Sequence, residues 1–512
     1  MNLNILPTPK RVKCANPDRF LLNNSLELIS NFHDESLSKY YKNEICRYLP
    51  VNFDVTSHNS YKVILNAENS EIQNEGYILS INKENCIISA KDKKGFINAL
   101  QTLVQIAINE ETGVSLIECE IEDYPDFSYR GLHLDVVRHM FPIDYIFKYI
   151  DFLTFHKLNK FHWHLTDDQG WRIESRAYPL LNTIGSWRER TQTNHSDEEI
   201  LTFQEQRYGG YYSVEEITQV INYADERGVE VIPEIDIPGH SRAAIASYPQ
   251  LGTDRNAGFQ VADRWCMYNL YNNVLSPNDF TFEFLKTVFK EAAEIFPSKY
   301  FHLGGDECSK RWWNDSKDVK EFMINNQISD EFHLQTYFVE YVTKVLSECG
   351  KRSIGWHEIL EGDIPKDAII MNWGDDANCL EAVKRGHEVV MSPGKPVYFD
   401  HYQSIDKEEG VSLGGYNPLI EVYKFNPIPK ELQNTELAGK IIGAQANLWT
   451  EYIRTTKKLE IMLFPRLTAF AEAVWNYGNK APFEQFVQKL DENILRFYKI
   501  WGVEYYKLPK NF

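Results

Sequence analysis

Eight short apolar runs dominate the chain from residue 129 onward, and helix-like segments separate them. The runs cover residues 129–137, 160–168, 229–238, 299–307, 352–358, 368–374, 388–394 and 441–449. Near-continuous apolar character is typical of parallel strands that are buried on both faces. Between the first two runs, apolar residues from Ile146 to Leu153 recur at i, i+3, i+4 and i+7, the spacing of one helix face. Eight strands alternating with helices predict a (β/α)8 barrel over residues 125–512.

The first 124 residues have a different pattern, and a chain of 512 residues exceeds one typical domain. Strand-like runs occur at 61–66, 77–81 and 115–123, and residues 95–108 have a helical pattern. We therefore expect a small α/β domain over residues 1–124, which ends just before Pro125. No cluster of charged residues, histidines or glycines points to chemistry there, so a structural role is the simplest interpretation.

Composition excludes several classes of partner. The formal net charge is −19, so no basic surplus exists to neutralise nucleic acid or an anionic membrane. No window approaches the ~20 apolar residues of a membrane span, and the N-terminal residues lack a signal-like apolar run. Cysteines without metal-binding spacing predict reduced core thiols in a cytoplasmic protein. They lie at positions 14, 46, 86, 119, 266, 308, 349 and 379.

Polar and tryptophan side chains gather where the predicted strands end. Barrels of this type keep their sites at the carboxyl ends of the strands, so these residues are candidates for one site. Two long connections, at about 170–228 and 395–440, are expected to shape the cleft. The candidates are Asp135, Asp167, Asp168, His240, Asp306, Glu307, Trp356, His357, Trp373, Trp449 and Glu451.

The Asp306-Glu307 pair is the strongest catalytic signal. Five other Asp-Glu pairs occur, but only this one follows an apolar strand and two glycines, Gly304 and Gly305. The glycines let the backbone bend and a ligand approach closely. A bend can bring both carboxyls to the mouth of the barrel, where their repulsion makes one of them hold its proton more tightly. A partly protonated Glu307 is suited to general acid catalysis.

Aromatic and charged residues at other strand ends suit a sugar. Trp356, Trp373 and Trp449 close three strands and can form the walls of an apolar, ring-shaped pocket. Arg130 and Glu451 belong to the first strand and to the segment beyond the eighth, which are neighbours in a closed barrel. An arginine fork and carboxylates suit the recognition of sugar hydroxyls.

Two histidine motifs leave alternatives open. His162 and His164 alternate on the second strand and could bind a metal, which would indicate a metal-dependent barrel hydrolase. Packed, hydrogen-bonded histidines on a central strand are the other interpretation. His240 could bridge Asp167 or Asp168 to Glu307, and the doublet leaves the partner open. A sugar-binding protein without turnover is a third hypothesis, but binding alone would not need an acid beside a fixed anion.

Taken together, these motifs resemble glycoside hydrolase family 20, the β-N-acetylhexosaminidases, and the resemblance covers most of the chain. The segments GYILSI and GFINALQTLVQI are similar to the family's N-terminal domain. The barrel motifs follow in the family's order: YRGLHLDVVRHM, HWHLTDDQGWRIE, EVIPEIDIPGHSRA, HLGGDE, IGWHE, NWG, VYFD and GAQANLWTEYI.

The resemblance implies a retaining exo-enzyme in which the 2-acetamido oxygen of the substrate attacks the anomeric carbon, giving an oxazolinium intermediate. By position, Asp306 orients the acetamido group and Glu307 is the acid and base. Tyr398 hydrogen-bonds the acetamido oxygen, and His240 with Asp167 supports Glu307. The resemblance implies that neither a metal ion nor an organic cofactor is required.

The remaining implied roles concern binding. The three tryptophans enclose the acetamido methyl and the ring, while outer hydroxyls of the terminal sugar are held by Arg130, Asp400 and Glu451. The implied substrate is an oligosaccharide or glycoconjugate with a terminal β-linked GlcNAc or GalNAc, and a homodimer is an open alternative to a monomer. A tryptophan that many members carry after Asp400 has no clear counterpart, and Tyr416 and Tyr423 are the candidates to replace it.

Overall fold

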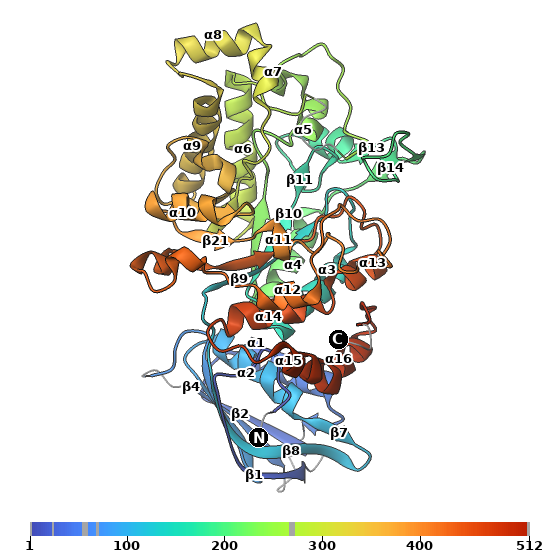
Figure 1. Ribbon diagram of the computed structural model, residues 1–512, viewed down its shortest axis with the longest axis vertical. Coiled ribbons are helices and arrows are strands. Elements are labelled where there is room, and N and C mark those ends of the chain that lie inside the picture. Colours follow the sequence, from blue (N-terminus) through green and yellow to red (C-terminus); the bar gives the residue numbers. More distant parts are fainter. Residues whose placement is uncertain (1–2, 23–24, 54–59, 68–70, 266–271, 509–512) are drawn as a thin grey trace.

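A closed barrel of eight parallel strands forms the larger part of the molecule (Figure 1). The computed structural model describes residues 3–22, 25–53, 60–67, 71–265 and 272–508. Each of the eight predicted apolar runs contains one barrel strand, so the predicted barrel is confirmed. The strands are β9 (Tyr129–Asp135), β10 (Lys160–His164), β17 (Glu230–Glu234), β18 (Tyr300–His302), β19 (Arg352–Trp356), β20 (Ile369–Asn372), β21 (Val389–Met391) and β22 (Ile441–Ala446).

Helices surround the barrel and return the chain from one strand to the next. The helix α4 begins with a capping box, in which Ser213 and Glu216 satisfy each other's backbone N–H groups. Asp330 caps α9 by accepting from the backbone of His333. The main barrel helices are α3 (Ile143–Phe155), α4 (Val214–Glu226), α6 (Asp279–Ile295), α9 (Glu331–Glu348), α10 (Asp376–Lys384), α13 (Thr456–Leu463) and α14 (Arg466–Trp475).

A mixed sheet with two helices precedes the barrel, at the lower end of Figure 1. Its main strand order is β1-β8-β5-β6-β4-β2-β3, and β7 (Ile108–Glu110) pairs with β8. Two helices, α1 (Glu35–Tyr48) and α2 (Lys93–Ile106), pack on this sheet. On the barrel side, α1 contacts α4 and α2 contacts α3. The other strands are β1 (Arg11–Leu22), β2 (Ser25–Ser30), β3 (Asn52–Phe53), β4 (Tyr61–Ala67), β5 (Tyr77–Ile81), β6 (Asn85–Ala90) and β8 (Gly113–Asp123).

The C-terminal helices lie between the barrel and the N-terminal sheet (Figure 1). They are α15 (Phe483–Lys489) and α16 (Leu495–Trp501). The ring of Trp501 lies 4.7 Å from that of Phe155 on α3, and its Nε1 donates to the hydroxyl of Tyr48 on α1 at 3.1 Å. One aromatic cluster therefore joins the last helix to both parts of the chain.

The sequence also predicted that no segment spans a membrane and that the cysteines are reduced thiols in the core. Among the described residues, no helix combines the length and the apolar character that crossing a membrane requires. The seven described cysteines are unpaired; Cys46 is exposed, and Cys266 lies outside the described residues. The prediction of core thiols holds for the four that are buried, namely Cys86, Cys119, Cys308 and Cys379.

The prediction that Arg130 binds hydroxyls of a sugar is wrong, because this residue lies at the opposite end of the barrel from the predicted site. It is the second residue of β9, and the amino-terminal ends of barrel strands gather opposite the site. Its guanidinium is 1% exposed and donates to the backbone oxygens of Phe127 and Lys157 at 2.7 and 2.8 Å. It forms an ion pair at 2.5 Å with Glu75 of the N-terminal part. Arg130 therefore connects the two parts of the chain.

We predict that Arg130→Met lowers the free energy of unfolding by roughly 3–5 kcal/mol, because it leaves Glu75 without its buried partner. Burial favours the neutral acid, but Arg130 and Lys94 lower the pKa of Glu75 to about 2. The stability from this pair is therefore present above the unfolded pKa of about 4.3 and is lost as the pH falls towards 2. Urea unfolding at pH 7 and pH 3 should show a larger difference at pH 7.

The matched control is Arg11→Met, which breaks an exposed ion pair with Glu122. Exposed pairs contribute at most about 1 kcal/mol. Equal losses of stability in the two variants would show that Arg130 does not anchor the N-terminal part.

Candidate active site

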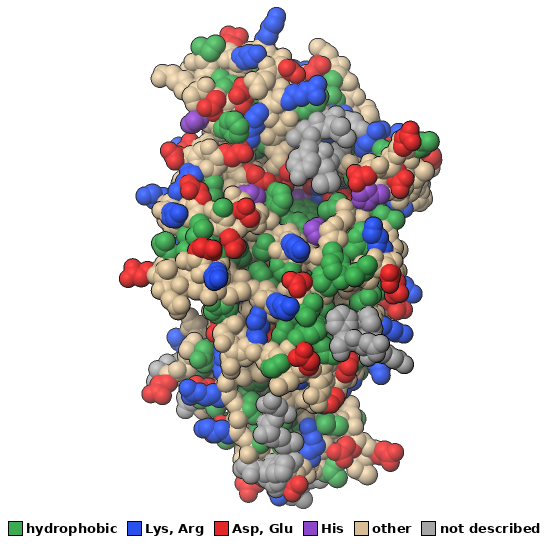
Figure 2. Space-filling model, viewed as in Figure 1, with side chains coloured by type: hydrophobic (Ala, Val, Ile, Leu, Met, Phe, Trp, Pro, Cys, Tyr) green, Lys and Arg blue, Asp and Glu red, His purple; other side chains and the backbone are tan. Residues whose placement is uncertain are grey.

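A cavity of about 190 Å³ opens at the carboxyl ends of the barrel strands. Figure 2 shows the hollow near the middle of this face, with hydrophobic side chains at its floor and acidic and histidine side chains close by. Segments that follow or end all eight strands contribute to it. The lining residues are Arg138, Asp167, His240, Asp306, Glu307, Trp356, Trp373, Gly394, Tyr398, His401, Leu413, Trp449 and Glu451.

A tight backbone turn after β18 presents two neighbouring acids to the same cavity. Gly304 and Gly305 have φ values of +73° and +98°, in the region that favours glycine. A Cβ at Gly304 would lie 1.7 Å from Oδ1 of Asp236, so no larger residue fits there. Glu307 itself has a φ of +45°, a strained conformation of the kind found at functional sites. The turn explains how Asp306 and Glu307 both line the cavity instead of pointing to opposite faces.

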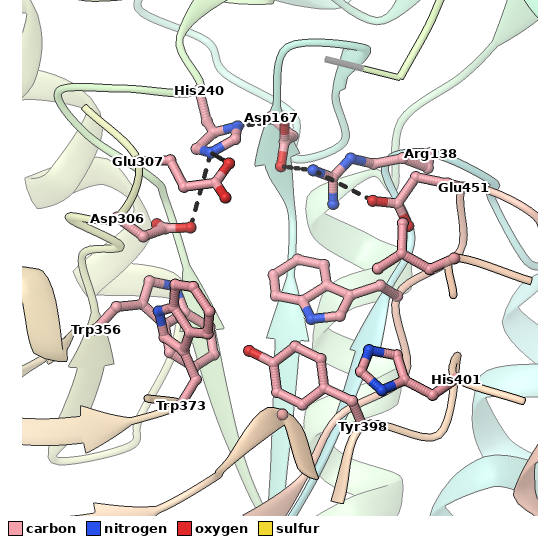
Figure 3. A pocket seen from close by; sticks show the side chains of 13 residues that line it. Arg138, Asp167, His240, Asp306, Glu307, Trp356, Trp373, Tyr398, His401 and Glu451 are labelled. Atoms are coloured by element: carbon pink, nitrogen blue, oxygen red, sulfur yellow. Dashed lines mark hydrogen bonds and ion pairs between the residues drawn. The ribbon is translucent and has the colours of Figure 1, made fainter. Parts of the chain in front are cut away.

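His240 stands between the two acids and a third carboxylate (Figure 3). Its Nε2 lies 3.5 Å from Oε2 of Glu307 and 3.7 Å from Oδ2 of Asp306. Its Nδ1 lies 3.1 Å from Oδ1 of Asp167 and 3.4 Å from Oδ2 of Asp168. One imidazole therefore contacts both acids of the Asp306-Glu307 pair with the same nitrogen.

The partner of His240, which the sequence left open, is Asp167. Asp168 has other contacts, because its carboxylate accepts from the backbone of Arg242 at 3.1 Å and from Asn273 at 3.0 Å. Burial disfavours a charged imidazole, but the ion pair with Asp167 outweighs it and raises the pKa of His240 well above its usual value. His240 is therefore a cation at neutral pH.

Arg138 is a site residue that the sequence analysis missed. Its guanidinium lies 2.9 Å from Asp167 and 3.8 Å from Glu451 (Figure 3). It also lies 3.3 Å from Asp135, and it covers the ring of Trp449 at 5.1 Å. It follows β9 by three residues, where the polar residues of the other strands also gather. Position at the strand end was the signal that should have favoured Arg138 over Arg130.

Aromatic side chains form one side of the cavity. The rings of Trp356 and Trp449 lie 6.0 Å apart, those of Tyr398 and Trp449 6.4 Å, and those of Trp373 and Tyr398 6.5 Å. The indole of Trp373 donates to the carboxylate of Glu358 at 3.0 Å, which fixes the ring. The three predicted tryptophans and Tyr398 thus line one hollow. Figure 3 shows Trp356, Trp373 and Tyr398 around it.

Several buried carboxylate oxygens at the site lack a partner among the described residues. They are Oδ1 of Asp306, both oxygens of Asp400 and Oε2 of Glu451. Burial raises the pKa of Asp306 and of Asp400, and the neighbouring Glu451 adds to the effect at Asp400. Asp400 is 3% exposed and does not line the cavity. Unpaired buried acids are costly, so a ligand with N–H and O–H groups suits this end of the pocket.

The two long connections contribute differently from the prediction. No lining residue comes from 170–228, whereas 395–440 supplies Tyr398, His401 and Leu413. Tyr423 is wrong as a replacement for the missing tryptophan, because it is 4% exposed and its hydroxyl donates to the backbone oxygen of Ala481 at 2.6 Å. Tyr416 is 41% exposed and does not line the cavity either.

The two histidines of the metal hypothesis lie inside the barrel below the cavity. Both nitrogens of His164 contact carboxylates, Glu234 at 2.5 Å and Asp167 at 2.9 Å. Nδ1 of His162 accepts from the side-chain amide of Gln445 at 2.9 Å, and its Nε2 lies 2.9 Å from Glu234. The packed and hydrogen-bonded interpretation therefore describes both rings.

An acid pair over an aromatic-walled hollow, at the carboxyl end of a (β/α)8 barrel, is the arrangement of a barrel glycoside hydrolase. Two family models match the chain and identify the family of glycoside hydrolases. The model described as glycosyl hydrolase family 20, catalytic domain, matches residues 127–477, and that of domain 2 of the same family matches residues 2–124. The chain belongs to glycosyl hydrolase family 20 and is a glycoside hydrolase of the β-hexosaminidase type.

Similar individual proteins support this family assignment. The chain is 39% identical to a beta-hexosaminidase of Porphyromonas gingivalis over 85% of its own length and 55% of that protein, so it spans little more than half of that relative. It is 35% identical to a beta-hexosaminidase of Vibrio furnissii over 92% of its length and 76% of that protein. It also resembles the solved structure of an exo β-N-acetylglucosaminidase from Vibrio harveyi in complex with N-acetylglucosamine. That match has a TM-score of 0.87 and 31% identity, and it covers 99% of this chain and 78% of the other.

We predict that Asp400→Asn stabilises the protein without ligand. The raised pKa of Asp400 means that ionising it costs the folded state free energy, so the wild type loses stability as the pH rises above the unfolded value of about 3.9. Asparagine is neutral throughout, so the melting temperature of the variant should exceed that of the wild type above pH 4, by more as the pH rises. The control, Asp406→Asn in the same loop, changes an exposed residue and should have no effect. A lower melting temperature for Asp400→Asn at pH 7 would contradict this account.

Proposed function

We propose that this protein is an exo-β-N-acetylhexosaminidase that removes a terminal, non-reducing β-linked GlcNAc or GalNAc from oligosaccharides or glycoconjugates. The observation that carries the proposal is that Asp306 and Glu307 both lie within 3.7 Å of one nitrogen of His240, beside the aromatic walls. The cavity, at about 190 Å³, is smaller than the roughly 300–1,000 Å³ of sites for drug-sized ligands. It suits one sugar ring, which supports exo action.

We further propose that the substrate supplies its own nucleophile. Asp306 and Glu307 are adjacent, whereas a retaining enzyme with a carboxylate nucleophile needs two acids on opposite sides of the glycosidic bond. Of the other two acids that line the cavity, Asp167 is paired with His240 and Arg138. Glu451 lies 3.8 Å from Arg138, at the end of the cavity to which we assign the outer hydroxyls. The 2-acetamido oxygen of a bound sugar is tethered at a high effective concentration.

In the first step, the acetamido oxygen forms a bond to the anomeric carbon while the bond from that carbon to the leaving oxygen breaks. Glu307 gives its proton to the leaving oxygen. The product is an oxazolinium ion, whose positive charge Asp306 stabilises by accepting from its N–H. In the second step Glu307 takes a proton from water, and the water oxygen attacks the anomeric carbon and restores the acetamido group. Two inversions give net retention.

The surrounding side chains suit these roles. The Tyr398 hydroxyl points into the cavity, where it can donate to the acetamido oxygen (Figure 3). Trp356, Trp373 and Trp449 can enclose the acetamido methyl group and the sugar ring. We assign to Arg138, with Asp400 and Glu451, the recognition of outer hydroxyls that the sequence analysis assigned to Arg130. We also propose that the boundary between the two domains lies between residues 124 and 125.

Replacing the acid tests the assignment. Glu307→Gln cannot give a proton to the leaving oxygen, so kcat on an unactivated disaccharide with a terminal β-linked GlcNAc should fall by about 10²–10⁴-fold. For Asp306→Asn, kcat should fall by about 10²–10³-fold, because the developing positive charge loses its fixed anion. The control is Glu226→Gln, in an exposed Asp-Glu pair at the end of α4. Equal rates in Glu307→Gln and the wild type would refute the assignment.

The nucleophile has a separate test. Aryl glycosides of glucosamine with N-acetyl, N-fluoroacetyl, N-difluoroacetyl and N-trifluoroacetyl groups have progressively less nucleophilic carbonyl oxygens. The value of kcat/KM should fall along this series, and an aryl β-glucoside without the amide should not be cleaved. A flat series would mean that a protein side chain attacks the anomeric carbon.

A further inference from the structure

A charged cluster fills the barrel interior below the cavity, and the proposed mechanism does not use it. Its central members are His162, His164, Glu234 and His302 from the neighbouring strands β10, β17 and β18, and each is 0% exposed. Glutamate is almost never fully buried unless it is paired, and burying a charge is costly. A cluster of this kind under an active site therefore calls for an explanation.

Glu234 is the centre of the cluster. Its Oε2 lies 2.5 Å from Nδ1 of His164 and 2.9 Å from Nε2 of His162, and its Oε1 lies 3.0 Å from Nδ1 of His302. Oε1 also accepts from the indole Nε1 of Trp356 at 2.9 Å. Burial opposes the charge, but the imidazoles lower the pKa of Glu234 well below its usual value. An ionised carboxylate thus holds one wall of the substrate pocket.

His164 connects this carboxylate to the catalytic side. Its Nε2 lies 2.9 Å from Oδ2 of Asp167, while its Nδ1 contacts Glu234. A ring with a carboxylate at each nitrogen donates from both, which requires the charged form. Burial opposes that form, but the two carboxylates raise the pKa of His164 to about 10. The ring therefore remains an imidazolium in the working range of pH.

A metal between His162 and Glu234 is a competing interpretation, because donor atoms of His133, His162 and Glu234 lie within 4.8 Å of one another. Two ligand atoms at about 2.0–2.1 Å from a tetrahedral zinc ion are roughly 3.3 Å apart. The observed separation of 2.9 Å between Nε2 of His162 and Oε2 of Glu234 is shorter than the separation that a tetrahedral zinc ion requires of two of its ligand atoms. These two atoms are therefore not spaced to bind one zinc ion.

We propose that His164 and Glu234 are a positioning pair that joins the acid side of the site to the acetamido side. The continuous chain of contacts runs from Glu307 through His240 and Asp167 to His164, then through Glu234 to Trp356. The chain fixes the position of the proton donor relative to the wall that holds the acetamido methyl. The proposal rests on the proposed function for the roles of its two ends.

The consequence is an energetic coupling between Asp167 and Trp356. Changes at sites without shared partners usually have additive effects, whereas members of one hydrogen-bond network do not. A change at Asp167 should therefore alter the position of Trp356, and it should do so only while the charged pair is intact. Couplings carried by such networks correspond to about 2- to 30-fold in rate or affinity.

The first experiment compares His164→Gln with His156→Gln. His156 is a matched control, because it is equally buried and hydrogen-bonded at both nitrogens, to Phe152 and Thr468, but belongs to the end of α3. Both variants should lose stability. Only His164→Gln should lower kcat, by about 2- to 30-fold with a smaller change in KM. Equal kcat in the two variants would overturn the proposal.

The second experiment does not depend on turnover or on His164→Gln folding. Protein labelled with 5-fluorotryptophan gives a ¹⁹F signal for Trp356, assigned with Trp356→Phe. Asp167→Asn should shift this signal in the wild-type background and leave it unshifted in the Glu234→Gln background. Equal shifts in both backgrounds, or no shift in either, would overturn the proposal. Failure of the wild type to cleave N-acetylglucosaminides would count against the proposed function alone.

Discussion

The ionised carboxylate of Asp167 is the interaction on which the site depends. It is buried, and its contacts with Arg138, His240 and His164 all lie between 2.9 and 3.1 Å. Burial alone would favour the neutral acid, but these cations hold the pKa of Asp167 well below its usual range. Because three cations share this anion, the position of each depends on the others. The proposed catalytic pair, the end of the pocket proposed to bind hydroxyls and the barrel interior meet at this residue.

The site combines satisfied charges with unsatisfied ones. Asp167 and Glu234 are fully paired, and they fix the groups around the substrate. Asp306, Asp400 and Glu451 instead retain buried oxygens without partners among the described residues. Such groups reduce the stability of the free protein, and they are typical of positions where a ligand supplies the missing donors. The paired acids therefore keep the site rigid, and the acids with unpaired oxygens are the ones suited to bind a ligand.

Most of the architecture could be predicted, because strands and helices give local patterns of apolar residues in the sequence. The eight apolar runs contain the eight strands, and residues 95–108 largely coincide with α2. The Asp306-Glu307 pair was recognisable from its two glycines, which the turn requires. The assignment of Arg130 failed because residue type was weighed above position along the strand. Arg138, eight residues later, has the same side chain at the correct end.

The sequence by itself determined the barrel, the acid pair proposed to be catalytic and the aromatic residues of the pocket, since strand periodicity and strand-end position are local properties of the chain. Only the tertiary structure decided which acid pairs with His240, where each arginine acts, and that Leu413 and His401 line the cavity while Tyr423 packs elsewhere. It alone revealed the link from Asp167 through His164 and Glu234 to Trp356. These contacts join residues from different strands, and their distances follow from the closure of the barrel and from burial, which no spacing along the chain encodes.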